Sequence, residues 1–239
     1  MSRNNAAAII IAAGTSQRME GIDKTFASLG GRPLVVWSLD AFQDCPSVSQ
    51  TILVLNENNI QAGQKLLASG RWPKLTDICL GGARRQDSVK AGLELLKTAG
   101  WVIIHDGARP FITRKLIEDG LQAARETGAA IAAVPARDTV KMARKNATVS
   151  RTIPRERIWL TQTPQVFRYN IIKRAYDRKT SDATDDAALV ERLGISVRLY
   201  HGSYLNMKIT TPEDLALARR QAIAISYRRR RLDQSRHWL

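Results

Sequence analysis

The sequence predicts an α/β fold in which a mostly parallel β-sheet is flanked by helices and carries a projecting β-arm. Short apolar runs that read as strands alternate with segments of helical periodicity along almost the whole chain. Some of these runs, such as Ala7–Ala12 and Ala129–Val134, are apolar throughout. Continuous apolar strands are typical of a sheet whose two faces are both covered by crossover helices. We therefore expect a Rossmann-like sheet.

The individual elements follow from the spacing of apolar residues. Strands are expected at Ala7–Ala12, Thr51–Leu55, Asp77–Leu80, Trp101–His105, Ala129–Val134 and Ser196–Tyr200. Helices are expected at Leu34–Gln43, Ile60–Ala68, Gln86–Lys97, Leu116–Glu126, within Val166–Arg178, at Asp185–Leu193 and at Pro212–Ala224. Gly128 can end the fourth helix as a C-terminal cap, and Thr211 before Pro212 can cap the last helix at its start.

The β-α alternation stops between Pro135 and Pro164, and there we expect the arm, at about residues 136–157. Two β-prone stretches, 137–141 and 151–154, flank a polar segment, which is the pattern of a hairpin. Its polar tip offers little to bury against its own domain, so the arm is expected to pair with a partner. A flexible surface loop is the alternative interpretation.

The length and composition indicate one large domain. The 239 residues, with a mass of 26.6 kDa, are enough to bury a sizeable core. We expect a single domain at residues 1–225 and a basic, mobile tail at 226–239. No apolar run is long enough to cross a membrane, and two cysteines are too few for a disulfide framework. A cytoplasmic setting is expected.

The net charge of +15 calls for an anionic partner. The last fourteen residues hold five arginines and one aspartate, so the rest of the chain still carries about +11. Aromatic residues make up only 6% and do not interleave with the basic residues, as a base-stacking surface would require. A polyanionic small molecule is therefore a better explanation than a nucleic acid.

The first strand leads into a small-residue turn followed by two cations. Ala12, Ala13 and Gly14 let backbone N–H groups approach an anion closely. Arg18 and Lys24 can then neutralise charge on a phosphoryl group. The alternative is an ordinary strand-to-helix turn with solvated cations.

Further candidate residues lie at strand ends and in turns. Gly82 and Ser88 belong to a glycine-rich strand-to-helix link, where a flat ligand can approach and Ser88 can donate a hydrogen bond. Asp106 follows a buried strand, at the sheet edge where open α/β sheets bind ligands, and its carboxylate suits Mg²⁺. Arg109 can fork onto a phosphate. The remaining candidates are Thr139 and Arg155 in the arm and Lys208, expected in a short strand before the last helix.

Taken together, these segments carry a family resemblance. From about Ala7 to Arg219 the chain resembles the nucleotidyltransferases of the sugar-nucleotide class, and most closely the 2-C-methyl-D-erythritol 4-phosphate cytidylyltransferase family. The first turn is shared by many nucleotidyltransferases, whereas the ordered set of later segments is specific. These are Gly81-Gly82 with Asp87-Ser88-Val89, His105–Pro110, Asp138–Lys141, Thr161–Gln165 and Asn206–Leu215.

The resemblance implies a role for each candidate. Arg18 and Lys24 match the pair that stabilises the transition state at the α-phosphate of CTP. Arg155 and Lys208 match residues that position the sugar-alcohol phosphate, which Arg109 and Thr139 also approach. The cytidine would lie on Ala12, Ala13, Gly14, Gly82 and Ser88, and Asp106 would lie near a Mg²⁺-triphosphate. The arm would exchange between the subunits of a homodimer.

The implied reaction transfers a cytidylyl group from CTP to 2-C-methyl-D-erythritol 4-phosphate and releases pyrophosphate, as a step of isoprenoid precursor biosynthesis. Another acceptor, ribitol 5-phosphate or molybdopterin, is the nearest alternative. A nucleic-acid-binding protein is the alternative from a different class, suggested by Arg228–Arg231. It would predict binding that falls steeply with salt and depends on residues 226–239.

Overall fold

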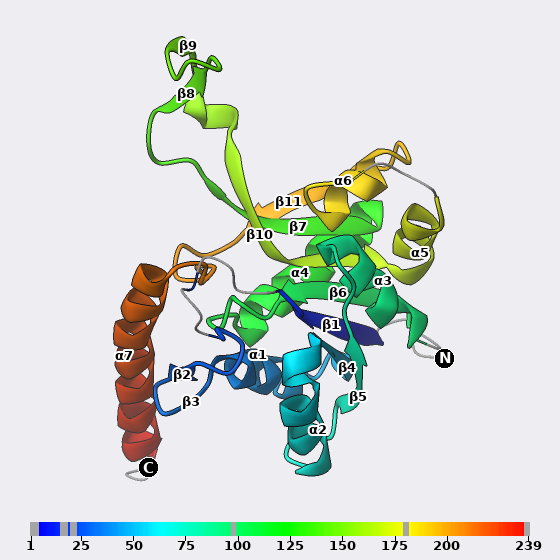
Figure 1. The fold of residues 1–239 in the computed structure, drawn as a ribbon, viewed down its shortest axis with the longest axis vertical. Helices are drawn as coiled ribbons and strands as arrows, with labels where there is room; N and C mark the ends of the chain where they lie inside the picture. Colours follow the sequence, from blue (N-terminus) through cyan, green and yellow to red (C-terminus); the bar gives the residue numbers. More distant parts are fainter. Residues whose placement is uncertain (1–4, 15–18, 20–22, 97–98, 179–181, 237–239) are drawn as a thin grey trace.

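The core of the molecule is a seven-stranded sheet. The computed structural model describes residues 5–14, 19, 23–96, 99–178 and 182–236, with side chains up to residue 225. The strand order is β11-β7-β10-β6-β1-β4-β5. The strands are β1 (Ala6–Ala12), β4 (Val48–Leu55), β5 (Leu75–Leu80), β6 (Trp101–Asp106), β7 (Ala129–Pro135), β10 (Trp159–Arg168) and β11 (Arg198–His201). Only β10 runs antiparallel to its neighbours in this sheet, so the expected mostly parallel α/β fold is confirmed (Figure 1).

Helices cover both faces of the sheet. Alternate residues of β1 pack into two clusters: Ala8 and Ile10 contribute to one face, Ala7 and Ile9 to the other. The first face is covered by α1 (Leu34–Gln43), α2 (Ile60–Ala68) and α4 (Arg114–Thr127), the second by α3 (Arg85–Glu94), α5 (Tyr169–Asp177) and α6 (Asp186–Glu191). Strands buried on both sides explain why the sequence shows unbroken apolar runs. Gly128 ends α4 in the left-handed conformation, with φ 84°, as the sequence predicts.

The strand β10 is the largest departure from the sequence prediction. It lies between β6 and β7, but its central residues Thr161–Gln165 are polar or proline, so no apolar run marked it. Residues 166–168, expected to belong to a helical segment, form the end of this strand instead. Gln162, Thr163 and Gln165 are buried because hydrogen bonds satisfy their side chains. A strand whose buried residues are polar and hydrogen-bonded does not appear as an apolar run, so the apolar pattern of the sequence could not reveal β10.

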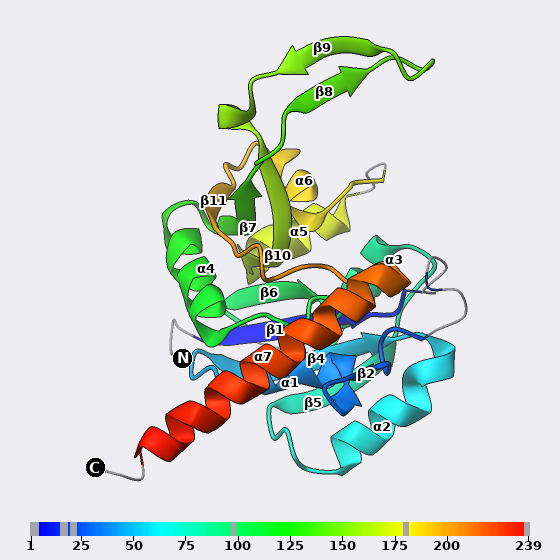
Figure 2. The ribbon, with the colours of Figure 1, turned by 90° about the vertical axis from the view of Figure 1, so that its left-hand side faces the viewer.

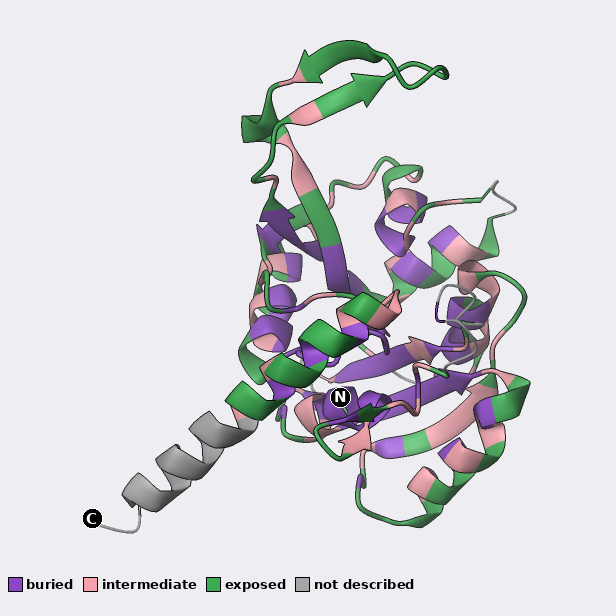
Figure 3. Cartoon of the chain, turned by 60° about the vertical axis from the view of Figure 1, so that its left-hand side comes forward, coloured by how far each residue is buried: buried purple, intermediate pink, exposed green. Residues whose placement is uncertain are grey.

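The expected arm is present and projects from the sheet. The strands β8 (Val140–Ala143) and β9 (Val149–Ile153) pair antiparallel and stand away from the body (Figures 1 and 2). The short helix η3 (Arg155–Arg157) leads from β9 into β10. Almost the whole arm is exposed, including the apolar side chains of Met142 and Val149 (Figure 3).

The last helix, α7 (Pro212–Arg236), crosses the outside of the body beside α1 (Figure 2). Leu215, Ala218 and Ala222 pack on an apolar cluster that also includes Trp37 of α1 and Leu29 of β2 (Ser28–Leu29). The strand β2 pairs with β3 (Arg32–Pro33) in a short hairpin. The helix was expected to end at Ala224 and instead runs to Arg236, so most of the predicted tail continues a helix. The end of the chain, 237–239, lies outside the described residues. In the described part of the chain, no helix is both long and apolar enough to span a membrane.

Two smaller expectations were wrong. Lys208 lies in an irregular segment that precedes α7, not in a strand. The helix α3, expected to continue beyond Leu96, ends at Glu94, and the chain then closes a turn in which Leu96 N–H donates to the Leu93 carbonyl. The expected last residue, Lys97, lies outside the described residues.

Candidate active site

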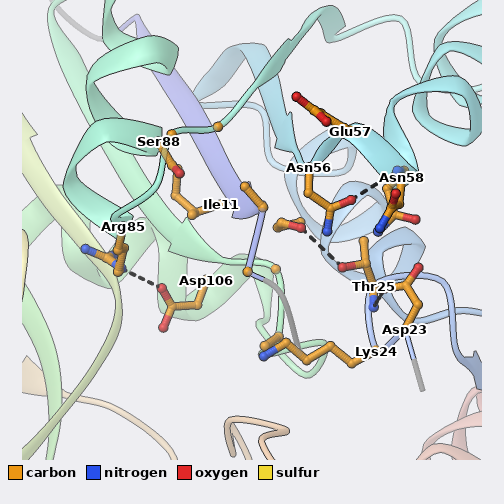
Figure 4. Close-up of a pocket in the computed structure, with 18 of the residues that line it drawn as sticks. Ile11, Asp23, Lys24, Thr25, Asn56, Glu57, Asn58, Arg85, Ser88 and Asp106 are labelled. Atoms are coloured by element: carbon orange, nitrogen blue, oxygen red, sulfur yellow. Dashed lines mark hydrogen bonds and ion pairs between the residues drawn. The ribbon is translucent and has the colours of Figure 1, made fainter. Parts of the chain in front are cut away.

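A cleft of about 860 Å³ opens at the carboxyl ends of four neighbouring strands. Its walls come from the ends of these strands and the segments that follow them: 11–14 at β1, 56–59 after β4, 81–85 after β5 and 106–108 at β6 (Figure 4). Asp23, Lys24, Thr25, Leu34, Ser88 and Lys208 complete the lining. A cleft outside the carboxyl ends of parallel strands is the usual ligand site of an open α/β sheet.

The floor of the cleft is made of small residues in close contact. A Cβ atom added to Gly81 would lie 2.3 Å from Ala13 Cβ and 2.5 Å from Ser88 Oγ, so no larger residue fits there. Ser88 Oγ donates to the Arg84 carbonyl, at the start of α3. Small side chains leave the backbone of this floor open to a flat or anionic ligand.

Lys24 is brought to the cleft by its neighbour Thr25. The Thr25 hydroxyl donates to the Ala12 carbonyl at the end of β1, at 3.2 Å, and the Thr25 carbonyl accepts from Val35 N–H in α1. The segment is therefore tied both to the first turn and to a helix. Figure 4 shows the Lys24 side chain extending along the cleft, on the same side as Asp106.

Asp106 is the centre of a cluster of charges. Its Oδ2 accepts from Lys208 Nζ at 2.8 Å and its Oδ1 from Arg85 Nε at 3.1 Å, while Arg109 Nε lies 3.9 Å from Oδ2. Burial alone would raise the pKa of Asp106, but the charges of Arg85 and Lys208 outweigh it and hold the pKa well below its usual range. The carboxylate therefore stays ionised at neutral pH and holds three cations at one end of the cleft.

The end of β6, which carries Asp106, is fixed by a buried chain of hydrogen bonds. The Asp106 N–H donates to Thr163 Oγ1, which lies 3.0 Å from His105 Nδ1, and His105 Nε2 lies 3.1 Å from the Arg109 carbonyl. A carbonyl only accepts, so Nε2 carries the proton and Nδ1 accepts from the threonine hydroxyl. Burial lowers the pKa of His105 to about 4, so the ring is neutral at physiological pH.

Most of the sequence-predicted site residues lie together in this cleft. Those that line it are Ala12, Ala13, Gly14, Lys24, Gly82, Ser88, Asp106 and Lys208. Arg109 lies behind the lining, where its Nη1 donates to the Asn206 carbonyl at 2.8 Å. Arg18 lies outside the described residues.

Two predicted site residues lie elsewhere. Thr139 is exposed in the loop that enters β8, and Arg155 is exposed in η3, where its Nη1 donates to the Arg137 carbonyl. Within the described part of the chain, neither lines the cleft. The fold of one chain thus places them at the base of the arm, and their role across a dimer interface stays a prediction.

A metal ion would find few protein ligands here. Among the residues that the structure describes, no three His, Cys, Asp or Glu side chains are grouped as a metal site. Asp106 supplies one carboxylate to the cleft, and Asp23 and Glu57 line it as well. A single carboxylate suits Mg²⁺ when substrate phosphates supply further ligands.

Sequence reasoning missed Arg85 as a site residue. Its guanidinium joins Asp106 to Asp186, which lies 101 positions further along the chain. The motif around Gly81-Gly82 contains Arg85, but nothing in the sequence links it to a carboxylate in α6. The segment 56–59, with the short helix η2 (Glu57–Asn59), was also missed as part of the cleft wall.

Comparison with known proteins gives one consistent result. The family model described as 2-C-methyl-D-erythritol 4-phosphate cytidylyltransferase matches residues 6–223. The enzyme of that name from Dehalococcoides mccartyi strain CBDB1 is 50% identical over 211 residues, covering 88% of this chain and 93% of the relative. Its namesake from Shouchella clausii is 44% identical over 216 residues, covering 89% and 94%.

Solved structures with the same activity in their names are also similar to this chain. The crystal structure of 2-C-methyl-D-erythritol 4-phosphate cytidylyltransferase from Thermus thermophilus has a TM-score of 0.73 and 35% identity, covering 90% of this chain and 97% of the other. That of 4-diphosphocytidyl-2C-methyl-D-erythritol synthase from Anaerococcus prevotii has a TM-score of 0.81 and 30% identity, covering 90% and 95%.

Proposed function

The chain belongs to the 2-C-methyl-D-erythritol 4-phosphate cytidylyltransferase family, and from this premise we propose how its cleft carries out the reaction. The enzyme transfers a cytidylyl group from CTP to 2-C-methyl-D-erythritol 4-phosphate in the non-mevalonate isoprenoid pathway. The observation that supports our assignment of roles is the cleft itself: a small-residue floor lies next to Lys24 and to the cluster of cations around Asp106.

The small-residue floor is the proposed nucleotide site. Gly14 and Gly82 leave backbone groups accessible to the nucleotide, and the Ser88 hydroxyl lies beside Gly81, within the same floor. Ala12 and Ala13 at the end of β1 have small side chains that leave room for the phosphates of the nucleotide. Backbone N–H groups in this turn can hold those phosphates.

Lys24, together with Arg18, is proposed to stabilise the charge that develops on the α-phosphate during transfer. Fixed cations are most effective when the fold holds them in place before the reaction. The bond from Thr25 to the Ala12 carbonyl supports such a role, because it holds the backbone next to Lys24 against the end of β1.

The acceptor phosphate is proposed to bind on the Asp106 side of the cleft, next to the α-phosphate held by Lys24. Lys208, paired with Asp106, lines the cleft there together with Arg85, and Arg109 lies behind the lining. We propose that the chain is a homodimer in which the arm brings Arg155 and Thr139 of a second copy to this side of the cleft. The exposed apolar residues Met142 and Val149 on the arm support this, because they would be buried by a partner.

Mg²⁺ is the proposed cofactor, with Asp106 as the protein group nearest to it, directly or through water. When bound, Mg²⁺ would neutralise the triphosphate and make pyrophosphate a better leaving group. The protein needs no nucleophile of its own, because an oxygen of the acceptor phosphate attacks the α-phosphorus in line. The residues of the cleft then position two polyanions and balance their charge.

An enzyme with two unpaired cysteines fits the predicted cytoplasmic location.

The test is pyrophosphate release by the full chain with Mg²⁺ and CTP, using 2-C-methyl-D-erythritol 4-phosphate or ribitol 5-phosphate as acceptor. We expect release only with the first acceptor, and its loss when a chelator removes Mg²⁺. Release with ribitol 5-phosphate alone would contradict the function, and turnover unaffected by the chelator would contradict the cofactor.

A further inference from the structure

One side chain, Arg85, connects the cleft to a carboxylate that lies behind it. Arg85 is the first residue of α3 and lines the cleft. Its Nε donates to Asp106 Oδ1 at 3.1 Å, and its Nη1 donates to Asp186 Oδ2 at 2.8 Å. Figure 4 shows the bond between Arg85 and Asp106 at the edge of the cleft. The planar guanidinium cannot turn toward one carboxylate without weakening its bond to the other.

Asp186 has no exposed side-chain surface and belongs to α6, so it lies behind the cleft wall. Its second oxygen, Oδ1, accepts from the Tyr176 hydroxyl of α5 at 2.5 Å. Burying a carboxylate costs several kcal/mol unless it is paired and hydrogen-bonded. Both oxygens of Asp186 have such a donor, and the charged one is the guanidinium that also holds Asp106.

We propose that Asp186 and Tyr176 are positioning residues for the cytidylyl transfer, acting through Arg85 on the Asp106–Lys208 pair. The proposal rests on the proposed function, because it assumes that Lys208 binds the acceptor phosphate. Asp186 holds one edge of the guanidinium, so the other edge is presented to Asp106 Oδ1. Oδ2 is then left for Lys208.

The charges around Asp106 indicate how Asp186 can affect the binding of the acceptor phosphate. Arg85, Arg109 and Lys208 balance Asp106 and Asp186, which leaves a net charge of one positive unit at this end of the cleft. Burial raises the pKa of Asp186 above its usual value, although Arg85 and Tyr176 act in the opposite direction. Without Asp186 the guanidinium would pair with Asp106 alone or turn into the cleft. Either change would alter how firmly Asp106 holds Lys208 and would weaken acceptor binding.

The decisive variant is Asp186→Asn, with Asp185→Asn as its matched control. Asp185 is the preceding residue; it caps α6 by accepting from Ala188 N–H and also accepts from Gln165 Nε2. The same substitution therefore perturbs the start of the same helix, and neither of these bonds involves Arg85. We expect Asp186→Asn to lower kcat/KM for the acceptor about ten-fold, with a raised KM for the acceptor and a KM for CTP within about two-fold. Groups that orient a site residue typically have effects of this size. Asp185→Asn should change neither KM.

Two further variants keep the test decisive if Asp186→Asn folds poorly. Tyr176→Phe removes only the hydroxyl and should raise the same KM to a smaller extent. Arg85→Lys offers a single ammonium group, which cannot bridge both carboxylates. If Asp186 acts through Arg85, then Asp186→Asn added to Arg85→Lys should change kcat/KM little further. Additive effects, or a KM for the acceptor equal to that of Asp185→Asn, would overturn the proposal.

A readout that needs no substrate separates this proposal from the proposed function. In wild type, the Nε–H of Arg85 should give a slowly exchanging NMR signal, because the guanidinium is held on two sides. The signal should broaden or exchange faster in Asp186→Asn but not in Asp185→Asn. An unchanged signal would overturn the proposal. Wild-type protein that is inactive with the acceptor would instead contradict the proposed function.

Discussion

His105 should make the stability of the fold depend on pH, and the size of this effect follows from its burial. The ring is fully buried and donates to the Arg109 carbonyl, so a second proton on Nδ1 would remove the bond from Thr163. Its pKa falls from 6.5 to about 4 on folding. A pKa difference of this size changes the free energy of unfolding by roughly 3 kcal/mol once the pH is low enough to protonate His105 in both the folded and the unfolded state.

The direction follows from the order of the two pKa values. The pKa is lower in the folded state, so the unfolded chain takes up a proton first as the pH falls below 6.5. The stabilisation is therefore complete above pH 6.5 and is lost as the pH falls toward 4. Between pH 7 and pH 4.5, His105 should cost the fold about 2.5 kcal/mol.

The assay is urea unfolding, followed by tryptophan fluorescence, at several pH values for wild type, His105→Gln and His201→Gln. Glutamine cannot titrate, so the free energy of unfolding of His105→Gln should fall by about 2.5 kcal/mol less than that of wild type over this interval. His201 is exposed, and His201→Gln serves as the control for the loss of a histidine at the surface. If the free energies of unfolding of wild type and His105→Gln changed in parallel with pH, the argument would be refuted. A pKa near 6.5 for His105 in the folded protein, measured by NMR, would refute it as well.

Three further predictions concern the cleft and the arm. Lys24→Ala should lower kcat by a factor of about 10²–10³ with little change in melting temperature, as expected for the loss of one transition-state donor; near-normal turnover would exclude this role. Gly81→Ala should raise KM for CTP and lower the melting temperature, because its Cβ would collide with Ala13 and Ser88; unchanged kinetics would show that the floor can yield. Replacing 138–153 by a short turn should convert a dimer into a monomer in sedimentation and abolish turnover, whereas a wild-type monomer would contradict the homodimer.

Much of the cleft was predictable because it is built from local sequence. Each wall follows directly from the end of a strand, and parallel strands bring their carboxyl ends to one edge of the sheet. Recognising the strands β1 and β6 was therefore enough to place Gly14 and Asp106 at the same edge of the sheet, whereas the direct pairing of these strands came from the structure. The glycine-rich link after β5 joined them for the same reason.

The partners of these residues were not predictable in the same way. Arg85 and Asp186 meet because α3 and α6 cover the same face of the sheet, although they are 101 positions apart. Similarly, Thr163 reaches His105 only because β10 inserts antiparallel beside β6. Ion pairs and hydrogen bonds between distant segments leave no periodicity in either segment.

The sequence by itself determined the α/β class, the strands and helices that repeat an apolar pattern, the presence of an arm and most of the segments that form the cleft, the exception being 56–59. These properties depend on which residues avoid water and on local turns, both of which are written in consecutive residues. Only the tertiary structure decided the place of β10, the three cations on Asp106, the link from Arg85 to Asp186 and the distance of Arg155 from the cleft of its own chain. Those depend on how distant segments pack in three dimensions, where burial forces each polar group to find a partner.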